Sequence, residues 1–168
     1  MKPTNLKTTL CTLTLFAAVS AAPTALAEPF EMSVILDRAH GDLVREGDYE
    51  SAILQISHGD HRMPFAASNN LCVAQTKLDD FEQAALSCDI AVQLAEFAAE
   101  NGRRDDVDYT TERAVAMSNR GVLRAYTGDL AGAEQDFRKA VELEPNTETP
   151  VQNLSHLLDG KAAELAKN

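Results

Sequence analysis

Basic residues and aromatic side chains are scarce in this sequence. Its 168 residues include 15 lysines and arginines against 26 aspartates and glutamates, which gives a formal net charge of −11. Because nucleic acids and anionic membranes are bound largely through clustered Lys and Arg side chains, this balance argues against both as partners. There is no tryptophan, and aromatic residues make up only 5% of the chain. Hydrophobic residues still make up 45%, too large a share for a disordered chain, so we expect one soluble, helical domain rich in Ala and Leu.

Long apolar runs are also missing, with one exception at the N-terminus. A lysine-containing start is followed by an uncharged, mostly apolar run over residues 8–22 and by a small-residue stretch that ends at Ala27. This is the pattern of a secretory signal peptide, and the run is shorter than the roughly 20 residues of a membrane-spanning helix. We therefore predict that residues 1–27 are removed and that the mature chain, 28–168, is secreted across the inner membrane without inserting into it. Its compartment is the periplasm if the source is Gram-negative.

Catalytic and metal-binding motifs are scarce too. The sequence has no Gly-rich phosphate loop, no nucleophile elbow and no metalloprotease signature. His58 and His61 flank a Gly-Asp pair, but no third cluster of ligands accompanies them, and His40 and His156 lie on other predicted helices. We therefore expect no catalytic residues, no cofactor and no metal, and a protein that is not an enzyme. A metal-binding protein or hydrolase built on these histidines is the least favoured alternative.

The chain does contain an internal repeat. Three segments have a Gly-Asp or Asp-Asp pair, then Tyr, Phe or Leu, and an Ala three residues further on; they span residues 47–52, 79–84 and 128–133. Gly and Asp tolerate the left-handed conformation that ends many helices, and the Asp that follows is a favoured helix N-cap. Each segment therefore predicts the end of one helix, a tight turn and the start of a second helix.

The third unit resembles a tetratricopeptide repeat (TPR), which has a period of about 34 residues. The landmarks that carry the resemblance are Gly121, Ala133, Phe137, Ala140 and Pro145. The resemblance implies that Gly121 and Ala133 let two helices approach closely, that Phe137 and Ala140 fill the core of the hairpin, and that Pro145 ends the second helix. At three positions of the first helix the motif prefers Trp, Leu and Tyr, where this chain has Met117, Arg120 and Arg124.

Weaker copies of the pattern extend in both directions, so the resemblance covers roughly residues 33 to 160. It implies repeats at approximately 33–66, 67–100 and 114–147, followed by a cap at 148–162. We therefore expect an all-α fold, a TPR-like solenoid of about three helical hairpins plus a C-terminal capping helix, similar to exported bacterial TPR proteins.

One spacing is longer than the repeat period. Ala84 and Ala133 are 49 residues apart, about 15 more than one repeat. We expect the helix that begins near residue 81 to run on to Asn101, and a new helix to be capped by Thr110 or Thr111. The hydrophilic loop between them, 101–109, is either solvated or a partner contact, and solvation is the simpler interpretation.

Two of the three cysteines lie in the predicted mature chain. Cys72 and Cys88 are each eight residues from Asp80, on opposite arms of a predicted hairpin, so they are expected at the same height on two antiparallel helices. Helices packed about 8–10 Å apart bring such facing positions within disulfide range. In an exported chain we therefore predict a disulfide, with two buried free thiols as the alternative. A catalytic thiol is not expected, because neither cysteine has a basic neighbour in sequence.

The resemblance also implies a binding groove, which in TPR proteins is lined by the first helix of each hairpin and holds a peptide or partner helix. Asn70, Asn119 and Asn153 recur at equivalent positions of these helices. An amide both donates and accepts, so a row of asparagines suits the backbone of an extended peptide; the alternative is that they bond to neighbouring helices and organise the stack. The full set of predicted groove residues is Asn69, Asn70, Val73, Lys77, Ser118, Asn119, Val122, Tyr126 and Asn153.

These features predict an exported protein-protein interaction module, or adaptor, that binds a protein or peptide partner in the groove. The alternative is a structural subunit of an envelope assembly, in which stacking replaces groove binding. The paired lysines of TPR carboxylate clamps are missing, and Lys77 and Arg45 are the only candidate cations. Capture of a chain-terminal carboxylate is therefore not expected.

Overall fold

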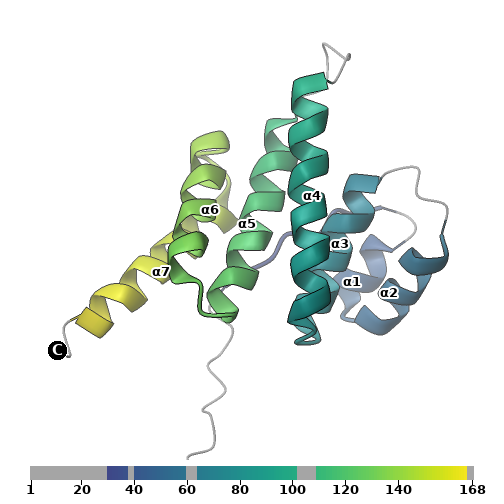
Figure 1. Ribbon diagram of the computed structural model, residues 1–168, viewed down its shortest axis with the longest axis horizontal. Coiled ribbons are helices and arrows are strands. Elements are labelled where there is room, and N and C mark those ends of the chain that lie inside the picture. The colour runs from purple at the N-terminus through teal and green to yellow at the C-terminus, as the bar shows by residue number, and fades with distance from the viewer. Residues whose placement is uncertain (1–29, 38–39, 60–63, 102–108, 166–168) are drawn as a thin grey trace, which may run out of the picture.

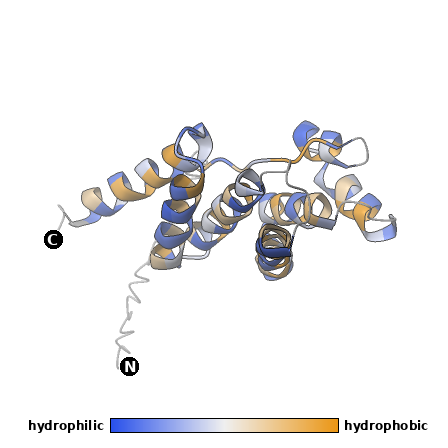
Figure 2. Cartoon of the chain, turned by 90° about the horizontal axis from the view of Figure 1, so that it is seen from above, coloured by the Kyte–Doolittle hydropathy of each residue, from blue (hydrophilic) through white to orange (hydrophobic). Residues whose placement is uncertain are grey.

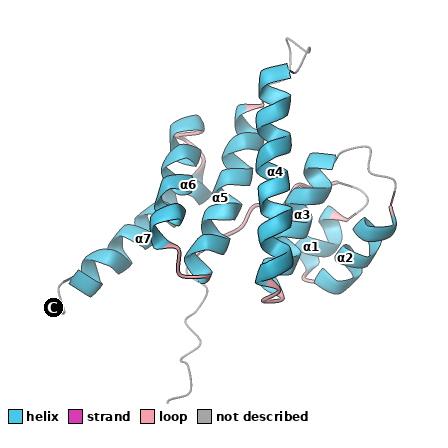
Figure 3. Cartoon of the chain, in the orientation of Figure 1, coloured by secondary structure: helices cyan, strands magenta, loops and turns pink. Residues whose placement is uncertain are grey.

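The computed structural model describes residues 30–37, 40–59, 64–101 and 109–165, and within these ranges the protein is all-helical (Figure 1 and Figure 3). The predicted signal peptide and most of the 101–109 loop lie outside the described residues. No helix in the described ranges is long and apolar enough to cross a membrane. The described residues form seven helices: α1 (Gly41–Glu46), α2 (Tyr49–His58), α3 (Pro64–Lys77), α4 (Phe81–Asn101), α5 (Thr110–Tyr126), α6 (Leu130–Leu143) and α7 (Glu148–Leu165).

Each helix packs against the next one along the chain, and α3 to α6 stand side by side (Figure 1). Helix α7 packs against both α5 and α6, where the sequence predicted a cap, and α1 and α2 cover α3. The region of the first predicted repeat, 33–66, holds the two shortest helices, and its residues 33–37 are extended. The extended stretch matters for function, because it lies against helices far along the chain.

The three predicted turns are present and share one hydrogen-bonding pattern. The N–H of the second turn residue donates to the carbonyl five residues back at 2.9 Å in every case: Asp48 to Leu43, Asp80 to Gln75, and Asp129 to Arg124. The residue before each Asp has a left-handed backbone, with φ of 84° at Gly47, 58° at Asp79 and 87° at Gly128. This is the Schellman arrangement, which satisfies carbonyls at the end of one helix before the next begins.

The Asp at the second position of each turn also caps the helix that follows, as the sequence predicted. Its carboxylate accepts the N–H three residues on: Asp48 from Ser51 at 3.3 Å, Asp80 from Gln83 at 3.4 Å, and Asp129 from Gly132 at 2.9 Å. Helix α4 ends at Asn101 as expected, but the threonine cap predicted for α5 is wrong. Tyr109 holds the N-cap position without a side-chain cap bond, and Thr110 is already the first helical residue.

The interior is built mostly from alanine and valine, with Phe137 as the largest fully buried side chain. Its ring lies beside Gly121 on the facing helix, where a Cβ atom would come within 2.6 Å of ring atom Cε1. A side chain at position 121 would therefore collide with a ring that has no free space to move into. The close approach of α5 and α6 at Gly121 and the burial of Phe137 in the core between them are the roles that the resemblance implied for these two residues.

Cys72 on α3 and Cys88 on α4 form the predicted disulfide, with their Cα atoms 4.8 Å apart. Both are fully buried, and they pack with Ala84 and Leu123 in one core cluster. The bridge therefore joins the two helices of the α3–α4 hairpin at the point where the hairpin meets α5.

The two arginines that depart from the repeat pattern share one buried carboxylate. Asp136 of α6 accepts hydrogen bonds from Arg120 Nε and Nη2, at 2.9 and 2.8 Å, and from Arg124 Nη1 at 2.8 Å. Arg120 also reaches the exposed Asp89 of α4 at 3.0 Å. Its hydrogen bonds to Asp136 raise the pKa of Arg120 further above its usual value. The arginines therefore replace an apolar contact by an ionic link between α4, α5 and α6.

We expect the substitution Asp136→Asn to lower the free energy of unfolding by about 2 kcal/mol, because it leaves two arginines facing an amide in a partly buried site. The matched control is Asp89→Asn, which weakens the exposed arm of the same cluster and is expected to cost less than about 0.5 kcal/mol. Urea denaturation followed by circular dichroism measures both. Equal losses in the free energy of unfolding for the two substitutions would show that the burial of Asp136 adds nothing to stability.

Candidate functional site

Residues 30–37, here called the N-terminal strap, run extended across one side of the helices (Figure 2). Along its length the strap contacts α7, then α5, then α3, in the reverse of their order in the chain. It lies on the opposite side of α3 and α5 from α4, as the two perpendicular views of Figure 1 and Figure 2 show. The surface under the strap is the one that the sequence predicted as a binding groove.

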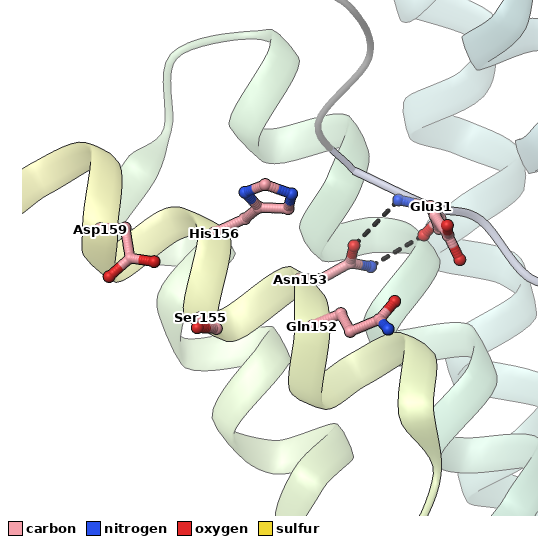
Figure 4. Close-up of a pocket in the computed structure, with 6 residues that line it drawn as sticks. All are labelled: Glu31, Gln152, Asn153, Ser155, His156 and Asp159. Atoms are coloured by element: carbon pink, nitrogen blue, oxygen red, sulfur yellow. Dashed lines mark hydrogen bonds between the residues drawn. The ribbon is translucent and has the colours of Figure 1, made fainter.

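Three asparagines hold the strap, one from each helix. In every case the backbone N–H of a strap residue donates to Oδ1, and Nδ2 of the same asparagine donates back to the carbonyl of that residue. The three pairs are Asn153 with Glu31 (2.9 and 2.8 Å), Asn119 with Ser33 (2.8 and 2.8 Å), and Asn70 with Ile35 (2.9 and 2.8 Å). Figure 4 shows the first of these pairs.

The spacing of the pairs follows from the geometry of an extended chain. The N–H and C=O groups of one residue point to the same edge of a strand, and those of the next residue point to the other edge. The asparagines therefore contact residues 31, 33 and 35 and leave the residues between them alone. Each carboxamide takes the place that a peptide group of a neighbouring strand takes in a sheet.

A fourth asparagine, Asn69, bonds to both the strap and the row, and Ser118 supports the row from α5. Asn119 Nδ2 also donates to Oδ1 of Asn69 at 2.9 Å, and Asn69 Nδ2 reaches the carbonyl of Ser33 at 3.0 Å. Asn153 Nδ2 lies 3.4 Å from the Ser118 hydroxyl. All these side chains are fully buried. The asparagine row thus makes both kinds of contact considered from the sequence, bonds to an extended backbone and bonds between helices.

The side chains of the alternate strap residues pack into the helices. Met32 contacts three of the four core clusters, Val34 contacts the one under α1 and α2, and Phe30 contacts the one around Phe137. The Phe30 ring stacks on Phe137 at 5.8 Å between centroids and meets the edge of Tyr126 at 6.0 Å. The strap therefore makes two sets of contacts: polar ones from the backbone of residues 31, 33 and 35, and apolar ones from the side chains of residues 30, 32 and 34.

The strap is fixed at its C-terminal end by the start of α1. Asp37 accepts the N–H groups of His40 and Gly41 at 2.9 and 2.7 Å, and its carboxylate lies 3.0 Å from Nε2 of the buried His40. Nδ2 of Asn70 is 3.1 Å from the other ring nitrogen of His40. A Cβ on Gly41 would collide with the carbonyl of Ile35 and lie 2.9 Å from Leu36 Cα. Position 41 must therefore be glycine for the strap to keep this path.

At the other end, where the strap begins at Phe30, a pocket of about 380 Å³ opens beside it (Figure 4). Its walls are hydrogen-bonding side chains of α7 together with Glu31: Gln152, Asn153, Ser155, His156 and Asp159. His156 also meets the edge of the Phe30 ring at 6.3 Å. The pocket therefore lies where Glu31 of the strap meets α7.

The other predicted groove residues lie on the same helices. Val73 and Val122 are buried in the core beneath the strap, and Tyr126 forms part of the wall around Phe30. Lys77 is the last residue of α3, and Arg45 is exposed on α1, where it pairs with Asp42 at 2.8 Å. The structure does not bring these two cations to one place in the asparagine row.

Sequence reasoning missed the strap itself. Its signal was the alternation of Phe30, Met32 and Val34 with Glu31 and Ser33, just before the first helix. That pattern is typical of a strand with one buried face.

His58 is exposed at the end of α2, and His61 lies outside the described residues. Among the residues that the structure describes, no group of three or more His, Cys, Asp or Glu side chains is placed to hold a metal ion. The chain matches no known protein-family model, and no curated protein and no solved structure is significantly similar to it.

Proposed function

We propose that this chain is an exported protein-interaction module, a TPR-like helical solenoid whose groove holds a segment of polypeptide in extended conformation. The observation that carries the proposal is the row Asn70, Asn119 and Asn153, which bonds to both backbone groups of every second residue of an extended chain. Backbone bonds of this kind are a common basis of peptide recognition, because they supply affinity for many sequences.

Burial of the amides strengthens the argument. An amide that is fully buried without partners costs several kcal/mol, so such groups are almost always hydrogen-bonded. Without a backbone in the groove, the Oδ1 atoms of these three asparagines would lose the donors that the strap provides. The groove is therefore a surface that needs a polypeptide, and the chain supplies one from its own N-terminus.

Three further observations support the solenoid and the export. The same Schellman turn and aspartate cap recur at all three predicted repeat turns, which is expected if each turn joins the two helices of an equivalent structural unit. The disulfide fits an oxidising compartment outside the cytoplasm. The N-terminal charge and hydropathy pattern is that of a secretory signal.

The test uses the full chain carrying Ser33→Pro, which removes the N–H that donates to Asn119 and so weakens the strap. A capped, labelled peptide with the sequence of residues 30–37 is titrated into it, and binding is followed by fluorescence anisotropy. We expect saturable binding with one peptide per chain. The same peptide N-methylated at Ser33 is expected to bind at least tenfold more weakly, because it lacks that donor.

The matched control is the peptide N-methylated at Val34, whose N–H belongs to the opposite edge of the extended chain. It is expected to bind nearly as well as the unmodified peptide. No saturable binding of the unmodified peptide, or equal losses from the two methylations, would contradict the proposed function.

A further inference from the structure

We propose that the N-terminal strap is a built-in competitor of the groove's partner, and that this partner is a strand-like segment with apolar side chains at three alternate residues. The inference rests on the proposed function and adds two things to it: what kind of segment the groove accepts, and what it must displace. Both follow from the way the strap is held.

The apolar contacts of the strap determine which sequences the groove can accept. While the odd residues bond to the asparagines through their backbone, the side chains of Phe30, Met32 and Val34 pack against the core clusters of the helices. Met32 at the centre touches the most core clusters, and the Phe30 ring is stacked on the buried Phe137. A polar side chain at any of these three positions would lose the apolar contacts that the strap makes there with the core clusters.

The outward residues set few limits. The side chain of Glu31 is exposed, and Ser33 and Ile35 bond to the asparagines through their backbone groups, whatever their side chains are. A partner segment is therefore selected by one face, with little demand on the other. This alternation is the pattern of a β-strand whose inner face has not yet been covered by the rest of its sheet.

The strap is placed so that it can be exchanged. It precedes α1 in the chain, and its hydrogen bonds to the asparagines are made to side chains, so it can leave without breaking any bond within a helix. It is tied at one end, where Asp37 caps the start of α1. A tethered segment of this length competes at an effective concentration in the millimolar range. The apparent association constant of a partner in solution is therefore its intrinsic value multiplied by the fraction of time that the groove is open.

The first arm of the experiment measures competition. The labelled 30–37 peptide is titrated into the wild-type full chain and into the Ser33→Pro and Leu36→Pro chains. We expect affinity for the Ser33→Pro chain to be about tenfold higher than for wild type, because one strap hydrogen bond is lost and the groove opens more often. Leu36→Pro is the matched control, since Leu36 is exposed and its N–H belongs to the edge that the asparagines do not contact; it is expected to bind like wild type.

A second variant makes the same test without a proline. Gly41→Ala pushes against the carbonyl of Ile35 and is expected to raise peptide affinity as Ser33→Pro does. Circular dichroism of each chain confirms that its helices are intact. If Ser33→Pro and Gly41→Ala bind the peptide no better than wild type and Leu36→Pro, the strap is not a competitor.

The second arm measures the register on the Ser33→Pro chain. A peptide of the same composition in the order Glu-Phe-Met-Ser-Asp-Val-Ile-Leu cannot place three apolar residues at alternate positions, even if it slides in the groove. We expect it to bind at least tenfold more weakly than the 30–37 peptide. Equal binding of the two peptides would overturn the alternating pattern and leave the proposed function standing, whereas binding of neither would overturn the proposed function itself.

Discussion

Replacing Phe137 with alanine is expected to lower the free energy of unfolding by about 3–5 kcal/mol, the usual range for removing a buried phenylalanine ring. The ring has no exposed surface and lies between α5 and α6, with Gly121 against one side. It also carries the stacked ring of Phe30 from the strap. The substitution therefore leaves a cavity that the close-packed helices cannot fill, and removes the support under the first residue of the strap.

The chain offers a matched control in Phe97→Ala. Phe97 is a phenylalanine in a helix of the same molecule but is 65% exposed, so its replacement is expected to change stability by less than about 0.5 kcal/mol. Guanidinium denaturation of the two variants and wild type gives the comparison. A loss at Phe137 no greater than that at Phe97 would mean that the α5–α6 interface is not the packed core described above.

Removing the disulfide is expected to cost about 3 kcal/mol of stability. The bridge closes a loop with a sequence separation of 16, and in the chain-entropy model a loop of about this size contributes roughly that amount by restricting the unfolded chain. The double variant Cys72→Ala and Cys88→Ala keeps small apolar side chains at both buried positions. Its helices should therefore form as before, with a lower midpoint of thermal unfolding.

Two measurements separate the bridge from the packing of the sulfur atoms. Wild type unfolded in the presence of a reductant should lose nearly the same stability as the double alanine variant, and the variant should not respond to the reductant at all. If reduction leaves the thermal midpoint of wild type unchanged, the bridge adds no stability. Two free thiols per chain in protein isolated under non-reducing conditions would show that it does not form.

Local chemistry explains which parts of this fold were predictable from sequence. A left-handed residue followed by Asp is a signal contained in two positions, so the turns at Gly47, Asp79 and Gly128 were expected correctly. The disulfide followed from equal arms around one of those turns. The asparagines were recognised because they recur at equivalent positions of the predicted first helices of the hairpins, which places them on one surface whatever lies there.

The remaining features depend on contacts between residues far apart in the chain. Arg120 and Arg124 depart from the repeat pattern, and their role could not be predicted because only helix packing brings Asp136 within hydrogen-bonding distance of both. The N-cap of α5 is Tyr109 and not Thr110, although threonine is the more favourable N-cap residue, so local propensity did not predict this helix start. The strap is eight residues without a helical or turn signal, and its extended form is set by three asparagines that are 35, 86 and 122 residues away in sequence.

Those separations have a consequence for how the molecule folds. A stack of helical hairpins contacts only its neighbours, so it can form and open from one end, unit by unit. The strap precedes α1 but bonds to α7, α5 and α3, so one segment holds together helices that are far apart along the chain. Because such distant contacts form only after the intervening chain has been ordered, strap docking belongs late in folding. Once the strap is docked, local unfolding of α3 or α7 also breaks its hydrogen bonds to the other helices, so we expect the helices to unfold more cooperatively.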